Sequence, residues 1–440
     1  MNAVVDFPVK PEARDYLARF ARDPREPGWL AARRQQAMTR FAELGFPTRR
    51  SESWRYLDLQ PLQQQPLLPE AAHALPEAAV LRERIAGLSL GAAGPRLVLV
   101  DGHVAAAWST GEVPQGVWFG AMARAVAERP DLARAALGDG ASEAAHPFAA
   151  LNAAFFADGY ILDVPPGMSL DEPIEVIHLA SGISTTSFHT RSLVRLGAGS
   201  RANLLDVYVG EGRYWRNDVV TLQLAERAEL SRTVVVEESA QAVHLAQLDA
   251  VLAADARFAG FALLLGGSRV RHEANVRLAG EGARLRLDGA FVVTGNDEAN
   301  IVTAIDHAAP GGQTRELVKG VAAGRGHGAF QGKIVVREHA QQTDAHQLSR
   351  NLIIGRRAAI DTKPELEIYA DDVKCSHGAS VGDLDEAALF YLRARGIPSE
   401  EARHMLIDGF LREAVEGVDD FAIRVHLLRR LAGHLANLEE

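Results

Sequence analysis

Cysteine is nearly absent from this sequence of 440 residues, which contains only Cys375. A single thiol excludes an internal disulfide framework and a metal site built from this chain's cysteines alone. No run approaches the roughly 18 uninterrupted apolar residues of a membrane-spanning helix. The N-terminus also lacks a basic region followed by a long apolar core, so we expect no signal peptide, no membrane segment and a cytoplasmic protein.

Basic blocks and nucleotide-binding motifs are also missing. The formal net charge is −10, and the arginines alternate with acids, which argues against a nucleic-acid partner. The phosphate-loop pattern GxxxxGK[ST] and the HExxH helix are absent, so we expect neither an ATP site nor a zinc-protease site. A β-helix enzyme acting on polysaccharide is disfavoured by an aromatic content of 6%. These absences favour a protein that is not an enzyme.

The central part of the chain carries an internal repeat. Between about residues 160 and 375, short runs of leucine and β-branched residues alternate with turns of small residues. Similar turns begin at Leu196, Leu224, Leu252 and Leu278, at intervals of 28, 28 and 26 residues. Such a period predicts a stacked architecture, and runs this short favour strands over paired helices. We therefore predict a β-helix, with a large antiparallel sandwich as the alternative.

The segments before the repeat have a different pattern of apolar residues. Apolar spacing predicts helices over residues 12–22, 29–44 and 121–137. A strand, a turn at Asp101-Gly102 and a second strand are predicted from Arg96 onward. Together with the repeat, this pattern divides the chain into an N-terminal helical or mixed region (1–145), a β-helix core (146–380) and a C-terminal helical region (381–440).

Three amphipathic helices are predicted at the C-terminal end. Asp383 is the expected N-cap of the first, with Glu386 three residues later, and Ser399 is the expected N-cap of the second. The third is predicted from Phe421 to about Asn437. One side of it carries Val425, Leu428, Leu431 and Leu435. These helices are suited either to cap the solenoid or to form a docking surface.

The segment 365–380 carries the residues with the most distinctive chemistry. If it is extended, Cys375 and His377 point to the same face, about 7 Å apart. A thiolate and an imidazole suit a soft or borderline metal, but a tetrahedral iron or zinc takes about four ligands. The remaining ligands would have to come from another chain or from the sulfides of a cluster. A buried structural cysteine and a hydrogen-bonded histidine remain the alternative. We expect structural or surface roles for the other histidines, among them His307, His327, His339 and His346.

Three segments together resemble the SufB/SufD family. They are GFPTRRSESWRYLDL (45–59), the segment 148–178, and TDAHQLSRNLIIGRRAAIDTKPELEIYADDVKCSHGASVGDLDEAALFYLRARGI (343–397). The resemblance implies a mainly β fold, a right-handed parallel β-helix flanked by N-terminal and C-terminal helical regions. It also implies assembly with a SufB-like paralogue and with SufC, an ABC-type ATPase. The complex builds nascent iron–sulfur clusters for transfer to apo-proteins.

The resemblance also implies roles for individual residues. The position matching His377 takes part in forming a transient cluster shared with SufB at the SufB–SufD interface, and Cys375 lies beside it. The C-terminal helices match the region that docks the ATPase. The absence of further cysteines favours the SufD branch. The resemblance also allows a homodimer of the isolated chain, because the paralogues share a core, and a purely structural adaptor without ligands.

Overall fold

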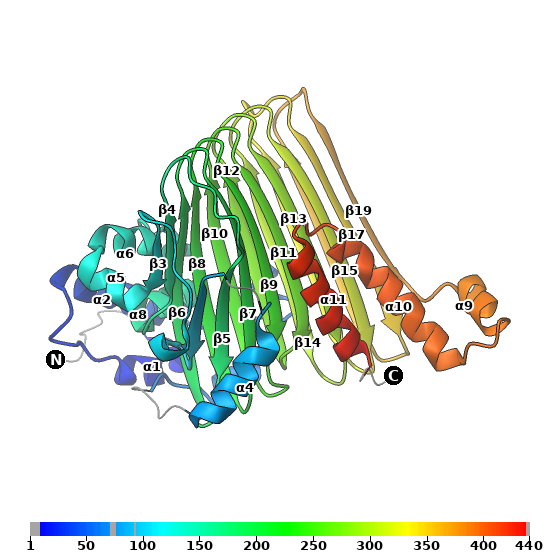
Figure 1. The fold of residues 1–440 in the computed structure, drawn as a ribbon, viewed down its shortest axis with the longest axis horizontal. Helices are drawn as coiled ribbons and strands as arrows, with labels where there is room; N and C mark the ends of the chain where they lie inside the picture. The colour runs from blue at the N-terminus through cyan, green and yellow to red at the C-terminus, as the bar shows by residue number, and fades with distance from the viewer. Residues whose placement is uncertain (1–8, 71–75, 92–93, 437–440) are drawn as a thin grey trace.

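The computed structural model describes residues 9–70, 76–91 and 94–436. Two predictions fall outside the described residues. One is the absence of a signal peptide, as far as it concerns residues 1–8, and the other is the end of the last predicted helix at Asn437. The described chain forms a long two-sheeted solenoid, with the N-terminal helices at one end and the C-terminal helices toward the other (Figure 1). No helix within the described ranges is long and apolar enough to cross a membrane.

The solenoid is built from strands that alternate between two sheets. Its strands are β4 Tyr160–Val164, β5 Ile174–Ala180, β6 Thr186–Leu196, β7 Arg201–Gly210, β8 Tyr214–Leu224, β9 Glu229–Glu237, β10 Val243–Leu252, β11 Arg257–Gly266, β12 Arg269–Leu278, β13 Arg284–Val293, β14 Glu298–His307, β15 Gln313–Ala323, β16 His327–Val336, β17 Asp344–Ile354, β18 Ala359–Ile368 and β19 Lys374–Gly382. The even-numbered strands lie in a 9-stranded sheet and the odd-numbered ones in a 10-stranded sheet. Neighbouring coils pair in parallel, so the predicted β-helix is confirmed and the antiparallel sandwich is wrong.

The sequence repeat corresponds to one coil. Leu196 pairs with Leu224, Leu224 with Leu252, and Leu252 with Leu278, so the first residues of the repeated turns form one buried stack. Each coil therefore buries its apolar side chains against the same positions of the coils above and below.

The repeated turns stack through their backbones. In each, one residue takes a positive φ, and its amide donates to a carbonyl of the next turn: Arg227 N to Ala254 O (2.9 Å) and Asp255 N to Glu281 O (2.8 Å) are examples. The residues at this position are Gly199, Arg227, Asp255, Gly282, Gly311 and Gln342. The small residues of the repeat are thus explained by a tight left-handed corner that recurs in every coil.

The N-terminal region contains η1 Pro11–Ala13, α1 Arg14–Arg19, α2 Gly28–Leu44, η2 Glu52–Trp54, α3 Gln60–Gln64, α4 Ala78–Leu88, β1 Arg96–Val100, β2 His103–Val104, η3 Ala106–Trp108, β3 Trp118–Ala121, α5 Met122–Glu128, α6 Pro130–Leu137, α7 Ala141–Ala145 and α8 Pro147–Phe155. The β1–β2 hairpin is confirmed, with positive φ at both Asp101 and Gly102. The helix predicted over 121–137 is wrong in one respect. It is two helices, because Pro130 has no N–H to continue α5 and instead begins α6.

The helix predicted over residues 12–22 is shorter than expected, since α1 ends at Arg19. Beyond it, Asp23 accepts the backbone N–H of Arg25 (2.9 Å), and Pro24 disfavours helical backbone at the residue before it. The helix predicted over 29–44 is confirmed as α2.

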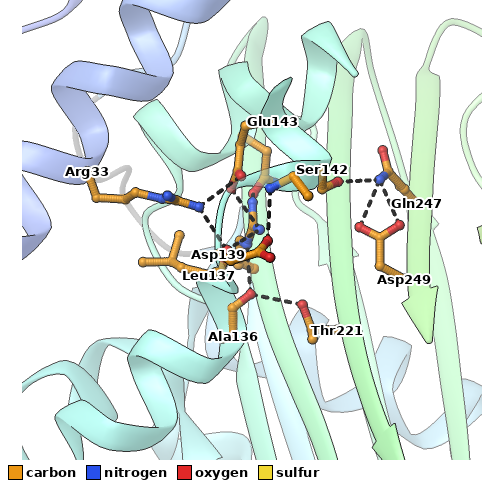
Figure 2. A network of polar contacts seen from close by, with 12 residues as sticks. Arg33, Ala136, Leu137, Asp139, Ser142, Glu143, Thr221, Gln247 and Asp249 are labelled. Carbon is orange, nitrogen blue, oxygen red and sulfur yellow. Dashed lines mark hydrogen bonds and ion pairs between the residues drawn. The ribbon is translucent and has the colours of Figure 1, made fainter. Parts of the chain in front are cut away.

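Polar contacts fasten the N-terminal helices to the 9-stranded sheet (Figure 2). Arg33 of α2 donates to Glu143 of α7 (2.9 Å), and the same carboxylate pairs with the buried Arg191 of β6 (3.0 Å). Gln247 of β10 donates to Ser142 (2.7 Å) and to Asp249. The buried charges of this junction are therefore paired, as burial requires.

The segment 45–59 lies against the same sheet further along the solenoid. Arg271 of β12 donates to Ser53 O (2.7 Å), and Glu298 of β14 accepts the backbone N–H of Asp58 (2.8 Å). Glu52 forms an ion pair with Lys363 of β18 (2.5 Å). This segment therefore ties the N-terminal region to coils as far as β18.

The C-terminal region consists of α9 Glu386–Arg393, α10 Ser399–Val415 and α11 Phe421–Leu435. In Figure 1, α10 and α11 lie across the 10-stranded sheet, whereas α9 projects away from it. Leu411, Leu427 and Leu431 are buried in one apolar cluster with residues of that sheet. The three predicted helices are thus present, and two of them cover the side of the solenoid.

Three details of these predicted helices are wrong. Asp385, not Asp383, caps α9, because its side chain accepts the backbone N–H groups of Ala387 and Ala388. Ser399 is the first helical residue of α10 rather than its cap, since Pro398 supplies the preceding extended residue. Val425 is exposed, so the buried side of α11 is formed by Ile423, Leu427, Leu431 and Leu435.

Candidate metal site at the end of the solenoid

The solenoid ends in two edge strands. β18 is the last strand of the 9-stranded sheet and β19 the last strand of the 10-stranded sheet. In the part of the chain that the structure describes, neither has a neighbour on its outer side. Unpaired strand edges readily add a further strand, so this end is suited to pair with another chain.

The turn before β19 fixes the register of the last strand. Gln342 N donates to Asp372 O (2.6 Å), Gln341 Oε1 accepts the backbone N–H of Asp372 (2.9 Å), and Lys374 N donates to Thr343 O (2.8 Å). Asp371 and Asp372 therefore belong to a turn, as their adjacency in the sequence suggests. β19 then pairs in parallel with β17, and each of its residues has a defined neighbour.

Cys375 points into the solenoid. It lies beside the fully buried Ala345 and packs, half-buried, against the apolar interior. Burial raises the pKa of the Cys375 thiol, while a hydrogen bond from the backbone of Ala345 lowers it and the charge of Asp344 raises it. Because a metal binds the thiolate, coordination here would have to displace the proton.

His377 shares the inward face of β19 with Cys375 because it lies two residues later on the strand. Its neighbour on β17 is Gln347, which is buried, but His377 itself is exposed because no further coil covers it. The structure thus places the two predicted ligands on one face of the last strand and leaves the imidazole accessible.

The outer face of the adjacent strand β17 carries a different histidine. His346 Nδ1 lies 2.6 Å from Ser376 Oγ, and its Nε2 lies 2.7 Å from Asp344 Oδ1. His307, His327 and His339 also have partners in Thr314, Asp361 and the carbonyl of Ala308, respectively. Residues 9–70, 76–91 and 94–436 contain no group of three or more histidine, cysteine or acidic side chains arranged to hold a metal ion.

Two buried polar residues behind His377 were not identified from the sequence. The strand register continues from His377 to Gln347 on β17 and to Glu316 on β15. Gln347 Nε2 donates to Glu316 Oε2 (2.6 Å). Burial raises the pKa of Glu316 to about 7, although hydrogen bonds from Gln347 and Thr303 lower it. The coil period could have revealed this alignment, because the three residues lie 31 and 30 positions apart.

Apolar side chains surround the open end. Ile368 at the end of β18, Tyr369 in the following turn and Val381 on β19 are all exposed. Exposed apolar side chains beside unpaired strand edges are typical of a protein–protein interface.

The sequence matches two family models over nearly its whole length. Residues 23–176 match the SufBD protein N-terminal region, and residues 178–410 match the SufBD core domain of SUF-system FeS cluster assembly. The chain belongs to the SufB/SufD family. It is 31% identical over 406 residues to the iron–sulfur cluster assembly protein SufD of Escherichia coli strain K12, covering 91% of this chain and 92% of that protein. It is 25% identical over 419 residues to SufD of Bacillus subtilis strain 168, covering 91% and 93%.

Membership of the SufB/SufD family connects the chain to iron–sulfur cluster assembly through the SUF system. The resemblance seen in the three sequence segments is therefore confirmed at the level of the family. Within the fold of this family member, the longest of those segments (343–397) forms β17, β18, β19 and α9.

Proposed function

We propose that the chain is a SufD-like scaffold subunit that contributes Cys375 and His377 to a transient iron–sulfur cluster site shared with a SufB-like paralogue. The single observation that carries the proposal is the position of both side chains on the inward face of an unpaired edge strand. A thiolate and an imidazole supply two of the roughly four ligands that an iron centre requires. A second chain seated on this end would bring the others.

The edge itself supports pairing with a paralogue. A chain with the same two-sheeted solenoid could continue both sheets, with one strand beside β18 and one beside β19. The exposed Ile368, Tyr369 and Val381 would then become buried. The same edge would allow two copies of the isolated chain to form a homodimer.

The C-terminal helices support docking of an ATPase of the SufC type. α9 projects from the solenoid, and its Phe390 and Tyr391 are 74% and 55% exposed. Large exposed aromatic side chains are enriched where proteins bind one another. In this proposal ATP is hydrolysed by that partner, and its motion alters the shared site by shifting the subunits.

His377→Ala should lower the iron and acid-labile sulfide content of the purified complex several-fold, because it removes a ligand from the shared site. Cys375→Ser should lower them as well, and neither change should unfold the chain, because His377 is exposed and serine is close to cysteine in size. The complex is co-expressed with the SufB-like and SufC-type subunits, and iron, sulfide and thermal melting are measured together.

His346→Ala is the matched control, since His346 lies on β17 beside the edge strand but on the outer face. It should leave the cluster content unchanged. If His377→Ala and Cys375→Ser instead lower the melting temperature while iron and sulfide stay at the wild-type level, the chain is a structural adaptor without a ligand role.

A further inference from the structure

Gln347 is a buried amide with only one of its two ends satisfied. Its side chain is 2% exposed, and its Nε2 donates to Glu316 Oε2. Its Oε1 has no hydrogen-bond partner among the described residues. A buried acceptor without a partner destabilises the folded state, because it has lost its hydrogen bonds to water, so a donor within reach would be bound favourably.

The orientation of this amide is fixed by its surroundings. A carboxylate only accepts hydrogen bonds, so above the pKa of Glu316 the NH₂ group of Gln347 faces Glu316 on β15. The oxygen then lies on the side of the amide group that does not contact Glu316. Across the interior, Gly332 of β16 leaves room for the amide, because a Cβ at that position would lie 2.1 Å from Gln347 Nε2.

The residue next to that oxygen on the inward face is His377, the strand neighbour of Gln347. His377 is exposed, and its position beside Gln347 puts the two side chains on the same face of neighbouring strands. A histidine that binds a metal through one nitrogen usually donates its other N–H to an oxygen, which fixes the tautomer and the ring orientation.

We propose that Gln347, held by Glu316, is the positioning residue for His377: its amide oxygen accepts one ring N–H and leaves the other ring nitrogen unprotonated and directed at the open end. This inference rests on the proposed ligand role of His377. According to this inference, the orientation of the His377 ring is set by two residues inside the solenoid. Gln347 lies one coil before the last strand and Glu316 lies two coils before it.

The test uses Gln347→Met, a replacement of similar length that removes the acceptor, in the chain labelled with ¹⁵N-histidine. Asn351→Leu is the control, because Asn351 is a buried amide on the same strand, four residues away from Gln347. The ring nitrogen shifts of His377 are recorded by NMR on the isolated chain at pH 8, above the pKa of Glu316.

The wild type and Asn351→Leu should each show one predominant tautomer of His377, and Gln347→Met should show a mixture. An unchanged tautomer in Gln347→Met would overturn the inference. The same variants are then assembled with the partner subunits, where Gln347→Met should lower the iron and sulfide content at least twofold. A mixed tautomer with unchanged cluster content would show that Gln347 orients the ring without affecting the cluster, which also overturns the inference. The ligand role of His377 would still stand or fall with His377→Ala.

Discussion

Two buried carboxylates inside the solenoid differ in how they are neutralised. Burial raises the pKa of Asp206, but Arg232 at 2.8 Å, together with His178 and Tyr160, holds the pKa below its usual range. Glu316 has no such cation, only the amide of Gln347 and the hydroxyl of Thr303, and its pKa is raised to about 7. Asp206 is therefore a paired structural charge, whereas Glu316 exchanges its proton near neutral pH.

This difference predicts a pH-dependent stability. Because the pKa of Glu316 is higher in the folded state than its ordinary value of 4.5, the folded state retains a proton that the unfolded state has lost between about pH 4.5 and 7. The free energy of unfolding should fall as the pH rises through that window, by on the order of 2–3 kcal/mol from this residue. Glu316→Gln removes the titration, so its stability should depend less on pH.

Urea denaturation of the wild type and of Glu316→Gln at pH 5 and pH 8 measures the effect. The amide oxygen introduced by this substitution can still accept the hydrogen bond from Gln347, so the variant changes the charge without removing that contact. Equal losses of stability between pH 5 and pH 8 in both proteins would show that Glu316 is not held protonated by burial.

At the level of single residues, the sequence predicted the candidate ligands but not what supports them. The alternation of side chains along a strand was enough to place Cys375 and His377 on one face. Gln347 and Glu316 were not predicted, because they lie on other strands and their alignment with His377 depends on the coil register. The prediction of Asp383 as N-cap was wrong for a local reason, since Asp385 also precedes the helix and only the backbone geometry shows which residue caps it.

At the level of elements, the short helix α9 is the least covered part of the C-terminal region. It exposes Phe390 and Tyr391, whereas α10 and α11 bury their apolar sides against the 10-stranded sheet. This contrast separates helices that stabilise the solenoid from one that is free to bind a partner.

Phe390→Ser combined with Tyr391→Ser should reduce co-purification of the SufC-type ATPase at least several-fold. The melting temperature should change little, because neither side chain is buried. Val80→Ser on α4 is the control, since it also removes an exposed apolar side chain from a helix. Full retention of the ATPase by the double variant would exclude α9 as the docking element.

Element types were predictable where the pattern was long and regular. The leucines of the repeated turns gave the coil period, and the pairing of Leu196, Leu224 and Leu252 follows it directly. The interrupted helix over 121–137 was not recognised because its apolar spacing continues across Pro130 and hides the break. The side of α11 that is buried depends on the sheet beneath it, which the helix sequence alone does not specify.

At the level of the whole molecule, the two ends of the solenoid are unlike. The first coils are covered by N-terminal helices, whereas each of the two strands that end the last coil has no neighbour on its outer side within the described ranges (Figure 1). A stacked fold normally requires a cap at each end, because an uncovered coil exposes apolar side chains and strand edges. The open end is therefore best explained as the interface proposed above. The division of the chain into regions at residues 145 and 380 stays a prediction.

The most direct measurement of a shared site is the magnetic coupling between the cluster and a ring nitrogen of this chain. The chain is labelled with ¹⁵N-histidine and reassembled with unlabelled SufB-like and SufC-type subunits, and the reduced cluster is studied by pulsed EPR. If His377 is a ligand, the coupling pattern changes from ¹⁴N to ¹⁵N when only this chain is labelled. A spectrum that is identical with labelled and unlabelled chain would contradict the account.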